Sequence, residues 1–344
     1  MIKGVPAALA VLAAFAFIAP PGVAQADTVE YFYKGKTLSI YVGVGAGGLY
    51  STFAQTLSRY MSKHIPGNPR IVVEHQLGAG GVVALNNVYN ELPKDGTVLI
   101  TPLSQTAKRV VLGDAAPKYD PRKWHWLGGW GETVVTCTVL NTAPALTVAD
   151  AKLKEDIIGS FDTGSLTYTY PIAANNLIGT KLKMVLGYPG GNEVRIAMER
   201  NEVHGLCAQY DGWKSTRPQW VSEGKLAHLV QFASKPHPDL PNVPLLSSFA
   251  RNDEDRQIMK FVEWGIEDRA LAVAPGVPLD RVAALEKAYM ATLRDPEFLA
   301  EAEKLKFEIA PITGTEIRDF VDEIMAIKPE TVEKIKKAMG LDKI

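Results

Sequence analysis

The sequence predicts an α/β protein built as two lobes. The chain has 344 residues, enough for two domains. Strand-like runs alternate with amphipathic helix-like runs, and glycine-rich loops follow several of the strands. Such alternation requires crossover connections and therefore mostly parallel sheets. The composition, 47% hydrophobic and 22% charged, supplies a core for each lobe and excludes disorder for most of the chain.

Residues 1–26 have the pattern of a secretory signal peptide. Lys3 supplies the positive charge, residues 7–18 form an apolar run too short to span a bilayer, and Ala24-Gln25-Ala26 is a cleavage site. We expect a mature chain that begins at Asp27 and is exported to the periplasm; an uncleaved N-terminal anchor is the alternative. No twin arginine precedes the run, which argues against export with a bound cofactor, and we expect none.

Strands and helices alternate along the first part of the mature chain. The predicted strands are 38–44, 70–74 and 97–101, and the predicted helices are 51–63 and 82–90. The glycine loops 43–48 and 77–81 connect them. This segment is the core of the first lobe.

A second α/β unit follows. Its predicted strands are 133–140, 157–161, 183–186 and 203–208, and its predicted helices are 170–178 and 193–200. After a proline-rich connection at 235–244, a last strand at 270–274 leads to helices at 281–293, from 296 onward and over 315–339. We expect lobe I to comprise residues 27–131 and 265–344 and lobe II residues 132–264, with two crossings near 131 and 265.

Cysteine and histidine usage gives no sign of a metal site. Cys137 and Cys207 are the only cysteines, and the six histidines are scattered without ligand spacing. Export permits a disulfide if the two strand-like runs that carry the cysteines are neighbours. We expect free buried thiols instead. The net charge of −1 and the absence of a basic stripe exclude a dedicated nucleic-acid role.

The glycine loops are better explained by anion binding than by a dinucleotide. Residues 43–48 match G-x-G-x-x-G, but Glu74 lies 31 residues beyond Gly43 rather than the roughly 20 of the dinucleotide fingerprint. A helix N-terminus offers unpaired N–H groups and positive potential, and glycine lets a ligand approach the backbone. Several such termini around one cleft could bind carboxylates; simple tight turns are the alternative.

The order of these motifs resembles the solute-binding receptors of tripartite tricarboxylate transporters, the Bug or TctC-like family. The family pattern P-G-G-x-x-D corresponds to Ala46-Gly47-Gly48-Leu49-Tyr50-Ser51, and V-V-x-N-x-x-G-A-G-G corresponds to residues 72–81. Further matches are P-x-D-G-T at 93–97, Y-x-G followed by E-V-x-G at 188–205, A-P-x-x-P at 274–278 and D-P-E-F at 295–298. The resemblance covers residues 31–335.

The resemblance implies a type II periplasmic binding protein that closes by hinge motion on a ligand in a central cleft. It implies that first-lobe loops hold one carboxylate, partly through water, and that the second lobe holds the far end. Together with the loop pattern it places these residues in the site: Gly47, Gly48, Leu49, Tyr50, Ser51, Ala79, Gly80, Ser104, Gln105 and Thr106 in the first lobe, and Thr163, Gly164, Ser165, Tyr188 and Asp211 in the second.

Residues in and around the first glycine loop depart from the family pattern. Ala46 replaces the usual proline, Ser51 the usual aspartate and Gln55 the usual arginine. Losing the acid and the base together could mean a lost ion pair or a changed water arrangement. Tyrosines near the predicted mouth would suit an aromatic or longer acid, unless they pack the hinge or core: Tyr50, Tyr168, Tyr188 and Tyr210.

The implied function is capture of a small organic acid, a dicarboxylate or an aromatic acid, by a monomeric receptor that delivers it to a membrane permease. No catalytic motif is evident. Two alternatives stay open. One is an exported hydrolase or transferase with Ser51 or Ser165 as nucleophile, for which His75 is the nearest candidate base. The other is a ligand sensor that feeds a receptor kinase.

Overall fold

The computed structural model describes residues 1, 29–46, 49–102, 105–161, 163, 165–188, 190–263, 265 and 269–342. Residues 2–26 of the predicted signal peptide, and the predicted site residues Gly47, Gly48, Ser104 and Gly164, lie outside this set. Within it, no helix combines the length and the apolar character needed to cross a bilayer.

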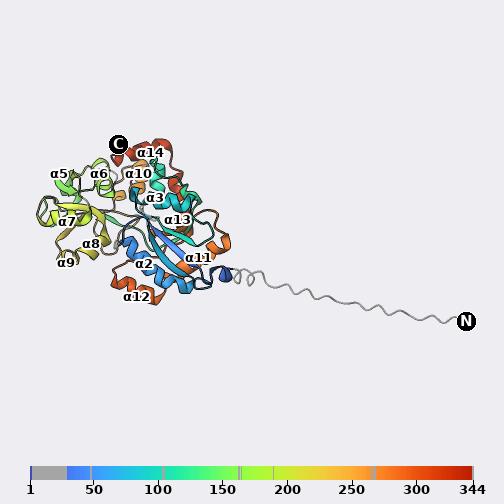
Figure 1. Ribbon diagram of the computed structural model, residues 1–344. Helices are drawn as coiled ribbons and strands as arrows, with labels where there is room; N and C mark the ends of the chain where they lie inside the picture. Colours follow the sequence, from blue (N-terminus) through green and yellow to red (C-terminus); the bar gives the residue numbers. More distant parts are fainter. Residues whose placement is uncertain are drawn as a thin grey trace.

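Two five-stranded sheets form the centres of two lobes (Figure 1). The first sheet has the order β2-β1-β3-β10-β4, and its strands are β1 (Thr37–Val42), β2 (Arg70–His75), β3 (Val98–Thr101), β4 (His125–Gly129) and β10 (Ala270–Val273). The second has the order β7-β6-β8-β5-β9, and its strands are β5 (Val135–Leu140), β6 (Asp156–Gly159), β7 (Leu182–Val185), β8 (Gly205–Gln209) and β9 (Leu226–Phe232).

Each sheet contains one strand that runs against the others. β1 pairs in parallel with β2 and β3, whereas β10 is antiparallel to both β3 and β4. In the second sheet β6 pairs in parallel with β7 and β8, whereas β5 is antiparallel to both β8 and β9. The reversed strands, β5 and β10, are the ones that follow a passage between the lobes. The predicted α/β class with mostly parallel strand directions is confirmed.

Helices cover the first sheet. They are α2 (Leu49–Met61), α3 (Val82–Asn90), α4 (Thr106–Val111), α11 (Leu279–Thr292), α12 (Pro296–Lys304) and α13 (Gly314–Met325). The apolar face of α2 is buried, and its Phe53 stacks on Trp130 with ring centroids 3.6 Å apart. Burying a side chain of this size contributes about 1.5–3 kcal/mol. This packing fixes the first turn of α2 against Trp130, which lies at the passage between the lobes.

The second sheet carries its own helices. They are α5 (Val148–Leu153), α6 (Leu166–Ile178), α7 (Gly191–Glu199), α8 (Tyr210–Thr216), α9 (Pro218–Ser222) and α10 (Asp253–Glu263). The short 3-10 turns of the chain are η1 (Ser62–His64), η2 (Ala79–Gly81), η3 (Pro121–Lys123) and η4 (Leu246–Phe249). The last helix, α14 (Pro329–Ala338), packs against α10 and α6 (Figure 1). Asn176 of α6 donates to the carbonyl of Ala338 at 3.0 Å.

A disulfide joins Cys137 of β5 to Cys207 of β8. The two residues face each other in the antiparallel register of these strands, and their Cα atoms are 3.9 Å apart. The expectation of free thiols is therefore wrong. The cysteines are 70 residues apart in sequence, and the sequence pattern did not show that their two strands are neighbours in the sheet.

Candidate functional site

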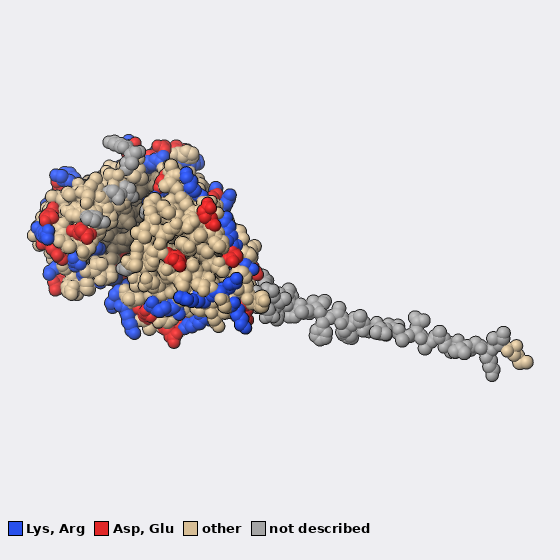
Figure 2. All heavy atoms as spheres, viewed as in Figure 1, with Lys and Arg blue, Asp and Glu red and all other residues tan. Residues whose placement is uncertain are grey.

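The loops predicted to bind anions start at matching edges of the two sheets. The parallel strands β1, β2 and β3 end at the same edge of the first sheet, and β6, β7 and β8 do so in the second. Ligands of open α/β sheets bind outside these carboxyl ends. Figure 2 shows the hollow that lies between the two lobes.

One cavity of about 420 Å³ is bounded by both lobes. Leu49 and Thr52 of α2 contribute from the first lobe, together with residues 305–307, which follow α12. The second lobe contributes the following residues: Arg195, Gln209, Asp211, Gly212, Ser215 and Thr216. Two predicted site residues from opposite lobes, Leu49 and Asp211, are therefore brought together.

A second cavity, of about 330 Å³, also joins the lobes. Gln105 and Arg109 line it from the first lobe, and Thr163 and Thr169 from the second. Gln105 has a left-handed backbone (φ 72°), which turns the chain sharply at the start of α4. Gln105 and Thr163 are a second predicted pair that the fold places at one cavity. Thr163 also lines a cavity of about 720 Å³ between α6 and the end of the chain.

Ser51 lies in the first turn of α2 and is fully buried. Its Oγ is 2.8 Å from Nε2 of His75, the last residue of β2, and accepts a hydrogen bond from Gln55 at 3.3 Å. Two of the residues that depart from the family pattern, Ser51 and Gln55, thus contact each other. Beside Ser51, the ring of Tyr50 packs edge-on against Trp130.

The other first-lobe positions differ in exposure. Ala79 begins η2, is exposed and has a left-handed backbone (φ 47°), with Gly80 next to it. Thr106, the first residue of α4, is completely buried.

In the second lobe, Ser165 precedes α6, and its Oγ is 2.7 Å from Oγ1 of Thr167. Tyr188 is partly buried, and this burial raises the pKa of its phenol. Its ring packs close to Gly159, where an added Cβ would lie 3.3 Å from Cε2. Tyr188 therefore lies beside the carboxyl end of β6.

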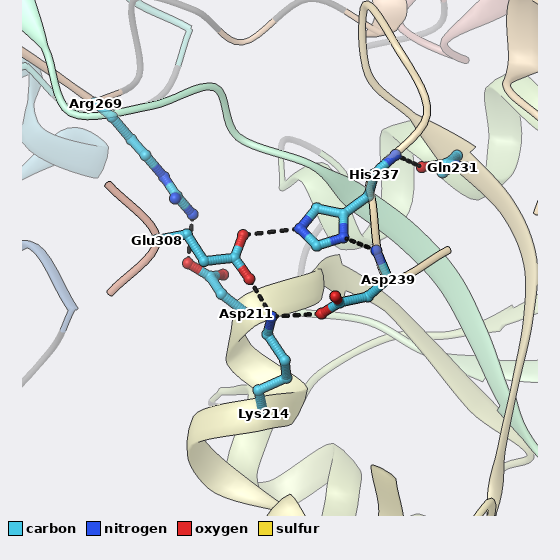
Figure 3. A network of polar contacts seen from close by, with 7 residues as sticks. All are labelled: Asp211, Lys214, Gln231, His237, Asp239, Arg269 and Glu308. Carbon is cyan, nitrogen blue, oxygen red and sulfur yellow. Dashed lines mark hydrogen bonds and ion pairs between the residues drawn. The ribbon is translucent and has the colours of Figure 1, made fainter. Parts of the chain in front are cut away.

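Asp211 forms a buried ion pair with Arg269. Its Oδ2 accepts a hydrogen bond from Nη2 of Arg269 at 2.5 Å, and both residues are buried (Figure 3). Its Oδ1 is buried without a partner among the described residues. Arg269 lies directly before β10, so this pair connects α8 of the second lobe to the second passage between the lobes. Sequence reasoning selected Asp211 but gave no sign of Arg269.

A second group of charges adjoins this pair. Lys214 of α8 forms ion pairs with Asp239, at 2.8 Å, and with Glu308, and Nε2 of His237 lies 2.8 Å from Glu308 (Figure 3). Burial raises the pKa of Glu308, but the hydrogen bonds from His237 and Lys214 outweigh it and hold that pKa at about 2. Side-chain atoms of His237, Asp239 and Glu308 that could bind a metal ion lie within 4.8 Å of one another. The ammonium of Lys214, however, already pairs with both carboxylates.

The most informative side chain that sequence reasoning missed is Arg195 of α7. It is 7% exposed and lines the 420 Å³ cavity, and burial lowers the pKa of its guanidinium to about 10. The only local signal was a basic residue one turn into the helix that follows Gly190-Gly191.

Comparison with known proteins identifies the fold. No family model and no curated protein matches the sequence. Among solved structures, a TctC solute-binding protein from Polaromonas superposes with a TM-score of 0.68 at 17% identity, covering 90% of this chain and 99% of that one. The chain has the TctC-type fold.

Two further structures agree. The periplasmic binding protein BugD gives a TM-score of 0.64 at 20% identity, over 89% of this chain and 98% of that one. MatC from Rhodopseudomonas palustris, solved with bound malate, gives 0.61 at 19% identity, over 88% and 99%. The two-lobed type II binding-protein architecture implied by the motifs is confirmed. In this TctC-type fold, the cavities that join the lobes are the candidate binding site.

Proposed function

We propose that the protein is a periplasmic receptor that captures a small carboxylic acid, with a dicarboxylate as the leading candidate, between its two lobes. It passes this acid to the permease of a tripartite tricarboxylate-type transporter. The observation that carries the proposal is the pairing of predicted site residues across the lobes, Leu49 with Asp211 and Gln105 with Thr163, in a TctC-type fold. The malate bound to MatC supports a dicarboxylate.

A thermal-shift screen tests the proposal. The mature chain from Asp27 is unfolded and refolded to remove any acid acquired from the host. It is then melted with mono-, di- and tricarboxylates, aromatic acids included. A ligand at a hundredfold excess over its Kd stabilises the folded state by about 2.7 kcal/mol, which corresponds to a shift of several degrees. A shift confined to one class of acid supports the receptor. A flat screen contradicts it.

The Ser51–His75 contact keeps one alternative in view, an exported hydrolase. A nucleophile hydrogen-bonded to a base is the first requirement of such chemistry. Ser51 is fully buried, however, and its Oγ already accepts from Gln55, so it does not face a substrate. We interpret the contact as a support for the first turn of α2. His75→Ala is expected to leave ester hydrolysis at the level of buffer. A measurable hydrolase activity that this substitution abolishes would favour the enzyme.

The residues of the candidate site do not determine what the receptor does with its bound acid, and delivery to a permease is therefore tested separately. The alternative is a sensor that presents its closed state to a receptor kinase. Reconstitution separates the two: the receptor is expected to stimulate uptake of the bound acid into vesicles that contain the membrane subunits of a tripartite tricarboxylate-type transporter. Stimulation of a kinase, without uptake, would favour signalling.

A further inference from the structure

We infer that the guanidinium of Arg195 binds the second carboxylate of the ligand, and so selects dicarboxylates over monocarboxylates. This inference rests on the proposed function, because it assigns a residue to one end of the acid. Its basis is a buried cation that faces a cavity between the lobes and has no acidic partner within the described part of the chain.

The guanidinium lies in a slot shaped by residues of two helices. It stacks on the ring of Trp213 of α8, with its central carbon 4.7 Å from the ring centroid. A Cβ added at Gly191, the first residue of α7, would lie 2.9 Å from Nη1, and one added at Gly212 would lie 3.3 Å from Nη2. Absence of side chains at these two glycines therefore makes room for the guanidinium. The slot fixes its position beside the first turn of α7, where unpaired N–H groups also favour an anion.

Arg195 has no acidic partner among the described residues. Within that set its Nε is buried without a hydrogen-bond partner, and its guanidinium forms no ion pair. Burying a cation without a counter-charge is unfavourable, and burial here lowers the pKa of the guanidinium. Arg217 lowers that pKa further by repulsion. A carboxylate in the cavity would relieve both effects through two parallel hydrogen bonds.

The remaining charges of the cavity also favour an anion. Arg195, Asp211 and Lys306 are its charged lining residues. The carboxylate of Asp211 is already neutralised by Arg269 at 2.5 Å. Arg195 and Lys306 are then the lining charges that form no ion pair with a described residue. Lys306 is exposed at the rim and comes from the first lobe, whereas Arg195 is buried in the second. A dianion can therefore meet positive charge when the lobes close on it.

The test compares each acid with its own monoamide, which keeps the length and shape but removes one charge. The probes are succinate, succinamate, adipate and adipic acid monoamide, titrated calorimetrically into the refolded wild type and into Arg195→Gln. The variant is expected to lose affinity for the diacids by about 30-fold or more, the usual effect of truncating one partner of a buried charge pair. It should lose less than about threefold for the monoamides.

Arg217→Gln is the matched control. Arg217 lies in the same lobe and also stacks on a tryptophan, Trp220, but it is paired with Glu199 at 3.1 Å and does not line the cavity. The Arg217→Gln variant should bind every probe with the affinity of the wild type. If Arg195→Gln does not fold, as judged by its melting without ligand, Arg195→Lys keeps the cation and should retain the preference for diacids while binding them more weakly.

Three outcomes would overturn the inference. In the first, Arg195→Gln binds diacids as tightly as the wild type. In the second, it loses diacids and monoamides equally, which assigns Arg195 a structural role on Trp213. In both cases the receptor function stands, because the wild type still binds acids. In the third, the wild type binds no acid, and the receptor function fails together with the inference.

Discussion

Arg269 and Asp211 form a buried ion pair that joins the start of β10 to α8, with 2.5 Å between Nη2 and Oδ2. Truncating one partner of a buried pair leaves the other charge uncompensated, which costs about 3–5 kcal/mol. We therefore expect Asp211→Ala to lower the free energy of unfolding by that amount in urea titrations. Glu223→Ala is the control, because Glu223 pairs with Lys225 at 2.6 Å where both are about half exposed. It should cost less than about 1 kcal/mol. Equal losses of stability in the two variants would contradict a stabilising role for the Asp211–Arg269 pair.

The disulfide between Cys137 and Cys207 should stabilise the second lobe. It closes a loop of 70 residues, for which the chain-entropy relation gives about 4 kcal/mol. Urea unfolding with and without reductant measures this difference. Thiol titration of the unfolded protein should find no reactive thiol before reduction and two after it. Two reactive thiols in the unreduced protein would show that the bridge does not form.

Glu308 should make the protein lose stability in acid. Burial raises the pKa of its carboxyl, but hydrogen bonds from His237 and Lys214 bring the folded-state pKa to about 2, below the ordinary value of 4.5. The stabilisation is therefore complete above about pH 4.5 and is lost as the pH falls toward 2. Unfolding measured across this range should show a shallower decline for Glu308→Gln than for the wild type. Glu297→Gln, at an exposed partner of Lys63, should keep the wild-type slope; an unchanged slope in Glu308→Gln would argue against the network.

Glu263 should have the opposite effect. It is almost fully buried at the end of α10, and burial raises the pKa of its carboxyl to about 7. A raised folded-state pKa gives stability that is present below about pH 4.5 and lost as the pH rises through 7. Glu263→Gln keeps an oxygen that can accept from the Ser247 amide, now 2.7 Å from Oε1. It should gain stability over the wild type from pH 5 to pH 8. A difference that does not change with pH would contradict the assignment.

The local pattern of apolar residues was sufficient to predict some helices and strands with nearly correct bounds. The helix predicted at 82–90 coincides with α3, and the strand predicted at 70–74 is β2 with one more residue. β4 is not among the predicted strands; it contains Gly128-Gly129, and glycine is depleted in strands. A residue far away in the sequence requires the glycine at position 128, because a Cβ there would lie 2.8 Å from the carbonyl oxygen of Ile312. The sequence around residue 128 does not show this contact.

The loops of the candidate site can be placed from the sequence, whereas its charged residues cannot. The carboxyl ends of parallel strands share an edge, so the loops after β1, β2 and β3 could be placed together from alternation alone. Arg195, Arg269 and Lys306 belong to no motif. Arg195 and Lys306 line the 420 Å³ cavity from opposite lobes, and Arg269 pairs with Asp211, another lining residue. These contacts depend on how distant parts of the chain pack. His75 carried a usable signal, since it ends a strand beside a predicted loop, and the structure brings it to Ser51.

Binding of a carboxylic acid between the two lobes can be measured by isothermal titration of the refolded mature protein, with the acid that gives the largest thermal shift. We expect saturable binding of one acid per chain and a negative heat-capacity change as the lobes close over apolar surface. No heat of binding from any mono-, di- or tricarboxylate, with a folded protein in the cell, would contradict it.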